Sequence, residues 1–361
     1  MKTKNFKNTL FGAATLMLIS ILSVSCGNKK ADASATKSVT ITGAGSSFDN
    51  PLFSKMFASY YDSTKVQINY QSVGSGAGIS QLTGKTIDFG ASDAPMNSKQ
   101  DSAAVAPVLH IPITAGAVVI SYNLPEVKEA LQFTPDIIAN IFLGKITKWN
   151  DAAIAVANPG VKLPATPIVV AHRSDGSGTS AIFTSYLSKV SPDWQAKVGA
   201  GTAVNWPAGL GGKGNEGVSG LIKQTPGGIG YIELAYAIQN NIPYATVQNK
   251  AGNFIVPSIE SVTAAANINI PADGKVLLTD TDAPDGYPIA GFSWVLLYKE
   301  QAYGNRTQEQ VTQLVQLLYW MIHEGQKYGA NLHYAPLSSA AVTVGENLLK
   351  SATYNGQPIL K

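Results

Sequence analysis

The sequence predicts an α/β protein, because segments typical of strands and segments typical of helices alternate along most of the chain. Hydrophobic residues make up 45% of the 361 residues, which is enough for a sizeable core, and this length corresponds to about two domains. Glycine and proline are spread along the chain rather than concentrated, which excludes a fibrous or low-complexity protein.

Short apolar or alternating runs predict the strands. The longest one contains the run IPITAGAVVISYN, which is typical of a strand buried on both faces. In chain order, the predicted strands are 39–42, 66–71, 86–90, 110–123, 167–171 and 292–298.

Capping signals predict the helices. Asn50 is expected to cap a helix with Pro51 at its first position, and Thr307 opens a sequence typical of a capping box. Gly144 and Gly325 are expected to end helices. In chain order, the predicted helices are 50–61, 74–82, 134–144, 176–189, 218–223, 234–239 and 307–324.

The N-terminal segment is interpreted as an export signal. Three lysines lie in the first seven residues, and the apolar run 10–22 that follows is too short to span a bilayer as a helix. Small residues lead to Cys26, in a pattern that resembles a bacterial lipoprotein signal. We therefore predict a signal peptide (1–25), lipidation of Cys26 and a flexible polar tether (26–38). Ser23 departs from the pattern, which prefers Leu there, and the alternative is an ordinary secreted signal with an incidental cysteine.

Composition and spacing exclude several classes of function. Charged residues are only 14% of the chain, and the net charge of +3 equals the contribution of the three N-terminal lysines, so a nucleic-acid partner is not expected. A single cysteine excludes an internal disulfide and a cysteine-rich zinc site, and the four histidines lack metal-ligand spacing. We find no Ser/His/Asp set, and we interpret the glycine-rich segment 209–214 as a loop rather than a dinucleotide site. We therefore expect no catalysis, metal or cofactor.

Four stretches rich in Gly, Ser and Thr indicate an anion site. They are 43–51, 74–78, 89–93 and 172–180, and three of them lie just before predicted helices. Backbone N–H groups at helix N-termini bind anions, and hydroxyl groups add neutral donors. Arg173 is the only obvious cation in the set. Each stretch alone is more typical of a cap or turn, but four at separate strand ends favour a site for a small oxyanion.

Two acidic residues in these stretches bear on the identity of the ligand. Asp175 is explained by pairing with Arg173, which would orient the guanidinium. Asp93 can face an anion only if the anion donates a proton to it. Phosphate carries such a proton at neutral pH, whereas sulfate does not. The alternative for Asp93 is a turn or capping residue.

The motifs TGAGSSF, YQSVGSGAGI, IDFGASDAPM, FLGKITKWND, RSDGSGTS and GLGGKGNEGVSG occur in this order. In this series the chain resembles the periplasmic phosphate-binding proteins of high-affinity phosphate ABC importers. The resemblance extends from about Val39 to the C-terminus. It implies a two-lobed periplasmic-binding-protein fold of type II, with a mixed sheet in each lobe and the ligand between them. We expect lobe I to comprise 39–121 plus 292–361 and lobe II to comprise 122–291.

The resemblance also implies a set of ligand residues. Ser47 stands where the family often has Thr, Phe48 supplies a backbone N–H, and Asp93 accepts the phosphate proton. The complete expected set is Ser47, Phe48, Ser75, Asp93, Arg173, Ser177, Gly178 and Thr179, with Asp175 orienting Arg173.

We therefore expect a monomeric binding protein that captures inorganic phosphate outside the cytoplasmic membrane and delivers it to an ABC permease. Its N-terminal lipid would hold it at the membrane, and closure of a hinge would accompany binding. Two alternatives stay open at this point. One is a receptor for another tetrahedral oxyanion such as sulfate, and the other is an exported phosphate-processing enzyme.

Overall fold

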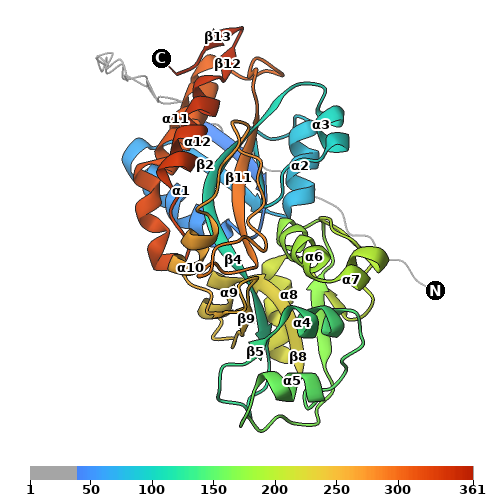
Figure 1. Ribbon diagram of the computed structural model, residues 1–361. Coiled ribbons are helices and arrows are strands. Elements are labelled where there is room, and N and C mark those ends of the chain that lie inside the picture. The colour runs from blue at the N-terminus through green and yellow to red at the C-terminus, as the bar shows by residue number, and fades with distance from the viewer. Residues whose placement is uncertain (1–38, 361) are drawn as a thin grey trace, which may run out of the picture. The chain divides into compact units, whose positions relative to one another are not determined.

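One mixed sheet of eight strands runs through the structure, a computed structural model that describes residues 39–360 (Figure 1). Helices flank this sheet, so the predicted α/β class is confirmed. Cys26 and the predicted signal peptide and tether lie outside the described residues. In sheet order the strands are β2 (Gln67–Ser72), β1 (Thr40–Gly45), β3 (Phe89–Ser92), β11 (Ala290–Tyr298), β4 (Val108–Tyr122), β8 (Gly228–Glu233), β6 (Val169–Arg173) and β7 (Leu210–Gly212).

The long strand β4 belongs to both halves of the sheet. Residues 108–117 of β4 pair with β11, and residues 118–122 pair with β8. We call β2, β1, β3, β11 and this first part of β4 the first half, and the rest of β4 with β8, β6 and β7 the second half. The sheet is therefore continuous, and the boundaries of the two expected lobes remain a prediction.

Strand direction brings the carboxyl ends of both halves together. β1, β2 and β3 are mutually parallel, and β11 is antiparallel both to β3 and to β4. β4 therefore runs in the direction of β1. β8 is antiparallel to β4, while β6 and β7 run parallel to β8. The parallel strands of the two halves thus run in opposite directions toward the middle of β4, where their carboxyl ends face each other.

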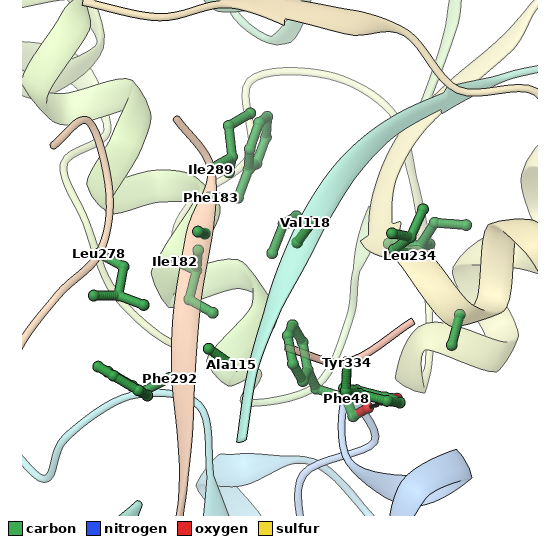
Figure 2. Packing of buried hydrophobic residues seen from close by; sticks show 14 of the residues in the cluster. Phe48, Ala115, Val118, Ile182, Phe183, Leu234, Leu278, Ile289, Phe292 and Tyr334 are labelled. Carbon is green, nitrogen blue, oxygen red and sulfur yellow. Dashed lines mark hydrogen bonds between the residues drawn. The ribbon is translucent and has the colours of Figure 1, made fainter. Parts of the chain in front are cut away.

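Apolar side chains pack closely around β4 and β11, as Figure 2 shows. Glycines in these strands give them room, because a Cβ atom at Gly116 would lie 2.6 Å from the ring of Phe48, and one at Gly291 would lie 2.3 Å from Ile182. The Phe48 ring in turn packs edge-on against Tyr334 at 6.1 Å. Truncating such a buried aromatic side chain typically costs about 3–5 kcal/mol of stability.

Twelve α-helices lie in the described part of the chain, with α1, α11 and α12 on one side of the first half of the sheet and α2 and α3 on the other (Figure 1). Their bounds are α1 Asn50–Thr64, α2 Ser75–Thr83, α3 Ser98–Ala104, α4 Pro135–Phe142, α5 Ala152–Ala157, α6 Gly178–Val190, α7 Pro192–Lys197, α8 Gly214–Gln224, α9 Leu234–Gln239, α10 Ile259–Ala265, α11 Gln308–Ile322 and α12 Ser339–Lys350.

Shorter elements complete the described chain. Two 3₁₀ helices, η1 (Glu324–Tyr328) and η2 (Ala330–Leu332), follow α11. A three-stranded sheet pairs β10 (Phe254–Ile255), β9 (Thr246–Gln248) and β5 (Gln132–Phe133), and a hairpin pairs β12 (Thr353–Tyr354) with β13 (Gln357–Pro358).

The structure corrects several predicted boundaries. Asp49, not Asn50, is the N-cap of α1. This helix continues to Thr64 and ends where Lys65 adopts the left-handed conformation. The strand predicted at 86–90 lies at Phe89–Ser92 instead. Just before it, Asp88 is fixed to Thr42 of β1, because its N–H donates to Thr42 O at 2.8 Å and its Oδ2 accepts from Thr42 N–H and Oγ1 at 2.7 and 2.8 Å.

Two further predictions at element ends are wrong. The capping box of Thr307 is present, but α11 ends at Ile322, and Gly325 lies inside a following 3₁₀ helix instead of stopping α11. Segment 209–214 is not a loop, because β7 occupies Leu210–Gly212 and α8 begins at Gly214. β7 is short and lies at the sheet edge, so it lacks the apolar run by which strands are recognised.

Candidate functional site

The candidate site lies where the carboxyl ends of the parallel strands meet. Ser46, Ser47 and Phe48 follow β1, and Asp93 follows β3. In the second half, Arg173 is the last residue of β6, and Asn215 lies in the first turn of α8 just after β7. Short connections therefore carry each of these side chains directly from a buried strand to one place.

Ser75 joins the two halves of the site. It begins α2, and its Oγ accepts hydrogen bonds from Asp93 N–H at 3.3 Å and from Gly178 N–H at 3.0 Å. Gly178 begins α6, and a Cβ atom there would lie 2.5 Å from Ser75 Oγ and 2.6 Å from Asp93 N and Oδ2. Only glycine therefore lets the start of α6 approach Ser75 and Asp93 so closely.

Asp93 is a buried carboxylate surrounded by hydroxyl groups. Its Oδ1 accepts from Ser46 Oγ and from Ser293 Oγ, the latter at 2.8 Å, and Thr179 Oγ1 lies 3.5 Å from Oδ2. Burial raises the pKa of Asp93 to about 6, although the hydrogen bonds of Ser46 and Ser293 and the charge of Arg173 oppose this increase. Asp93 is therefore ionised at neutral pH and can accept a further hydrogen bond.

Arg173 is held by a bidentate ion pair, as its sequence spacing to Asp175 predicted. Arg173 Nε and Nη2 donate to the two carboxylate oxygens of Asp175 at 2.8 and 2.6 Å, and Nη1 donates to Thr179 Oγ1 at 3.3 Å. Burial alone would raise the pKa of Asp175, but the hydrogen bonds and charge of Arg173, with Gly214 N–H at 3.1 Å, hold it below its usual value. The guanidinium is therefore oriented, and two of its five N–H groups remain for another partner.

Ser177 caps α6, because its Oγ accepts from Ser180 N–H at 2.9 Å. Ser47 and Phe48 lie opposite this helix start, on the first half of the sheet. Ser47 Oγ accepts from Asn215 N–H and from Asn215 Nδ2, each at 3.0 Å, and Phe48 N–H donates to Ser46 Oγ at 2.9 Å. Tyr231 links Ser180 to the other site residues, because its hydroxyl lies 2.6 Å from Ser180 Oγ and accepts from Arg173 N–H at 3.0 Å. All nine residues predicted from the sequence thus lie in one connected network.

Sequence reasoning missed Ser46, Ser293, Asn215 and Asp49. Asn215 is fully buried and donates from Nδ2 to both Ser47 and Thr179, while its Oδ1 accepts from Glu233 N–H at 3.0 Å. Asn215 lies in the glycine-rich motif GLGGKGNEGVSG, and this motif was the signal available in the sequence. Ser293 lies within an apolar strand and gave no signal.

Direct hydrogen bonds close one half of the site onto the other. Gly76 N–H donates to Gly176 O at 2.9 Å, and Tyr236 Oη donates to Ser47 O at 2.6 Å. Glu216, at the start of α8, accepts from Ser72 Oγ at 3.3 Å. The two strand-end clusters are therefore in direct contact, and the site residues are buried between them.

Within residues 39–360, no group of three or more His, Cys, Asp or Glu side chains is placed to hold a metal ion. In the same range, no helix combines the length and the apolar character needed to cross a membrane.

Comparisons with known proteins agree with this architecture. A family model described as a PBP superfamily domain matches residues 30–324. Among solved structures, the fold is similar to that of a high-affinity periplasmic phosphate-binding protein bound with phosphate, with a TM-score of 0.67, 19% identity and coverage of 86% of this chain and 93% of that one. A phosphate-binding protein from Stenotrophomonas maltophilia has a TM-score of 0.64, 18% identity and coverage of 85% and 92%.

Relatives at higher identity define the family more narrowly. The chain is 46% identical over 309 residues to the phosphate-binding protein PstS of Xylella fastidiosa, covering 84% of this chain and 83% of that relative. It is 43% identical over 313 residues to PstS of Pasteurella multocida, with coverage of 85% and 89%. The chain belongs to the PBP superfamily and, within it, to the family of phosphate-binding proteins named PstS. This family consists of binding proteins, which confirms the expectation that the chain is not an enzyme.

Proposed function

We propose that this protein binds inorganic phosphate outside the cytoplasmic membrane and delivers it to an ABC permease. The family supports this function, and the hydroxyl groups of the site supply the physical reason. Phosphate would lie between the two strand-end clusters, with donors contributed from both halves of the sheet.

The main support for the proposal is the number of hydroxyl protons that are left to donate in the site. Ser47 Oγ and Ser75 Oγ each accept two hydrogen bonds from N–H groups, so their lone pairs are used. Neither hydroxyl donates a hydrogen bond to any residue that the structure describes, and both side chains are buried. Two oriented hydroxyl protons and two guanidinium N–H groups of Arg173 are therefore left to donate, which is the arrangement that an oxyanion requires.

Asp93 then selects phosphate among oxyanions. An ionised carboxylate can only accept hydrogen bonds, so it favours an anion that carries a proton and repels one that does not. In the proposed site, Ser47 and Ser75 donate from their hydroxyls, and Asp175 keeps Arg173 in orientation. The Thr179 hydroxyl would turn its proton from Asp93 Oδ2, 3.5 Å away, to the ligand. The resemblance to the family adds backbone N–H groups of Phe48 and of residues 177–179 to the donor set. Three of these groups would have to exchange partners on binding, because Phe48 N–H donates to Ser46 Oγ at 2.9 Å, Ser177 N–H to Thr202 O at 2.8 Å and Gly178 N–H to Ser75 Oγ at 3.0 Å.

Calorimetric titration of the mature protein with phosphate, arsenate and sulfate tests the proposal. We expect tight binding of phosphate and of arsenate, which carries the same proton, and binding of sulfate that is weaker by orders of magnitude. Equal affinity for sulfate would instead indicate a general receptor for tetrahedral oxyanions. Hydrolysis of a generic phosphoester by the purified protein would indicate an enzyme.

Binding is proposed to close two lobes about a hinge. The proposed boundaries are 39–121 plus 292–361 for lobe I and 122–291 for lobe II. β4 passes from the first half of the sheet to the second near residue 118, and β11 begins in the first half at Ala290, which supports the placement. Small-angle scattering of the monomer should show a smaller radius of gyration with phosphate than without it, and an unchanged radius would contradict closure.

Export and anchoring are proposed from the N-terminal sequence. A signal peptide (1–25), a lipidated Cys26 and a tether (26–38) would hold the receptor at the membrane, near the permease. One acyl chain binds a membrane only marginally, so stable anchoring would require more than one chain. Cys26→Ser should release the protein from the membrane fraction or leave its precursor uncleaved. Fractionation and migration like those of the wild type would exclude the lipid anchor.

A further inference from the structure

Asp49 is a buried acid that the proposed phosphate site does not use. It is the N-cap residue of α1, yet its side chain caps none of the N–H groups of the helix. The carboxyl group turns inward, where Oδ2 lies 2.5 Å from Ser293 Oγ on β11, while Oδ1 has no hydrogen-bond partner. An acid at a helix start that does not cap the helix needs another explanation.

The Ser293 hydroxyl connects Asp49 to Asp93. Ser293 Oγ lies 2.5 Å from Asp49 Oδ2 and 2.8 Å from Asp93 Oδ1, with the carbonyl of Ser92 at 3.3 Å. One hydroxyl has one proton, so it can donate to only one of the two carboxyl groups. The other short contact requires a proton on the carboxyl side. One of the two carboxyl groups, Asp49 or Asp93, is therefore protonated.

The surroundings place this proton on Asp49. Asp93 receives a second hydroxyl from Ser46, and Thr179 and the guanidinium of Arg173 lie nearby, so its ionised form is stabilised. Asp49 has no second donor. A protonated Asp49 would donate through Oδ2 to Ser293 Oγ, and Ser293 would donate its own proton to Asp93.

Among residues 39–360, no charged group that faces Asp49 favours its ionisation. The titratable groups around it are Asp93, Glu233, Tyr70 and Tyr334. The Tyr70 hydroxyl donates to Ser46 O at 2.6 Å, and the Tyr334 hydroxyl donates to Phe48 O at 2.6 Å, so neither donates to Asp49. Burial, followed by the charge of Asp93, raises the pKa of Asp49 well above its usual value, although the Ser293 hydrogen bond opposes this. The N-terminus of α1 favours the carboxylate, but the N–H groups of this helix donate no hydrogen bond to the Asp49 side chain.

We infer that Asp49 is a positioning residue that holds a proton and, through Ser293, directs a hydrogen bond to Asp93, which keeps Asp93 as an ionised acceptor for the proton of the ligand. This inference rests on the proposed function. The residues concerned follow β1, follow β3 and lie within β11, so they all belong to the first half of the sheet. The hydrogen bonds that join Asp49, Ser293 and Asp93 therefore lie within the first half, while Thr179 and Arg173 of the second half further stabilise ionised Asp93. When Asp49 ionises, the single Ser293 proton must serve two neighbouring carboxylates, and phosphate affinity should fall.

Titration of the aspartate carboxyl carbons by NMR tests where the proton lies, with Asp49→Asn used to assign the signal. We expect one carboxyl group that remains protonated at pH 7 in the ligand-free protein and that is missing from the variant. A wild-type spectrum in which Asp49 is ionised at pH 7 would overturn the inference. If the variant does not fold, Ser293→Ala should still shift the Asp49 signal, and an unchanged signal would equally overturn it.

Phosphate affinity as a function of pH tests the consequence. The amide of Asp49→Asn can donate to Ser293 at every pH, so variant and wild type should bind phosphate alike wherever Asp49 is protonated. Above that range, the phosphate affinity of the wild type should fall relative to that of the variant, by up to about tenfold per pH unit for one linked proton. The titration of phosphate itself affects both proteins equally, so it cancels in the ratio of their two affinities.

Asp151→Asn is the matched control. Asp151, like Asp49, is the N-cap residue of a helix, but its side chain accepts a hydrogen bond from Ala153 N–H at 2.9 Å. The phosphate affinity of Asp151→Asn should depend on pH as that of the wild type does. Affinities of wild type and Asp49→Asn that differ while Asp49 is protonated, or that coincide after it ionises, would overturn the inference but leave phosphate binding intact. A wild type that binds no phosphate would overturn the proposed function, and the NMR titration would still decide where the proton lies.

Discussion

Replacing Asp93 with Asn tests whether a buried carboxylate selects phosphate over sulfate. Asp93 Oδ1 accepts hydrogen bonds from two hydroxyls, so the amide oxygen of the variant should keep this position and the amide nitrogen should replace Oδ2. Oδ2 lies 3.5 Å from Thr179 Oγ1, which already accepts from Arg173 and Asn215. The new N–H group is therefore left to donate to the bound anion.

The magnitude follows from the bond that is exchanged. A hydrogen bond to a charged group contributes about 1.5–3 kcal/mol, so phosphate should lose roughly 10- to 150-fold in affinity. Sulfate should bind the variant more tightly than the wild type, because an amide donor replaces a carboxylate oxygen that repels it. The phosphate-to-sulfate ratio should therefore narrow by about 10²-fold or more. Calorimetric titration of both anions into wild type and Asp93→Asn measures this ratio, and an unchanged ratio in a folded variant would refute the selective role of Asp93.

The same variant should change how stability depends on pH. Burial raises the pKa of Asp93 from 3.8 to about 6, so the stability that the protonated form contributes is fully present below pH 3.8 and is lost as pH rises through about 6. Asn does not titrate, so the ligand-free variant should lose less stability over this range, by on the order of 2–3 kcal/mol. Thermal unfolding of the wild type and of Asp93→Asn at pH 4, 6 and 8 measures this difference. If the stabilities of the two proteins change with pH in parallel, Asp93 is not buried in the free protein.

Three further predictions concern the contacts around the ligand. Gly178→Ala should weaken phosphate binding at least tenfold at unchanged fold, because the new Cβ atom would lie 2.5 Å from Ser75 Oγ; unchanged affinity would exclude this close approach. Arg173→Ala should cost about 1.5–3 kcal/mol of binding free energy, measured by titration, and it leaves Asp175 without its ion pair. Phosphate at about 100 times its Kd should stabilise the protein by about 2.7 kcal/mol, so an unchanged melting temperature in saturating phosphate would contradict binding.

The positions of most site residues could be predicted because the chemistry of the site follows from short local sequences. A strand that ends in Gly, Ser or Asp just before a helix marks a carboxyl end with free N–H groups, and this pattern places Ser75, Asp93 and Gly178 from the sequence alone. The Arg173–Asp175 pair could be predicted for the same reason, since both partners lie in one turn. The resemblance to a family then assigned Ser47 and Phe48, whose own sequence is that of an ordinary turn.

Contacts between distant segments could not be predicted in this way. Asn215 reaches Ser47 because β7 lies beside β6 at the edge of the second half, a pairing that a short strand in a glycine-rich segment does not indicate. The end of α11 is another case. Its apolar pattern continues toward Gly325, but the chain leaves the α-helix at Ile322, where the next residue, His323, has a ψ of −101°.

The contact between Ser293 and the two buried acids depends on strand register rather than on residue type. In β11, Ser293 pairs with Thr114 and Trp294 pairs with Pro112, so the register against β4 shifts by one residue between them. The extra residue, Ile113, lies in β4, so the ladder is disrupted and more strongly twisted beside Ser293. A serine inside the run AGFSWVLLY is a minor exception to a buried strand when only the sequence is considered. Placed at the register shift, it bridges Asp49 and Asp93, and the proton count of the site depends on it.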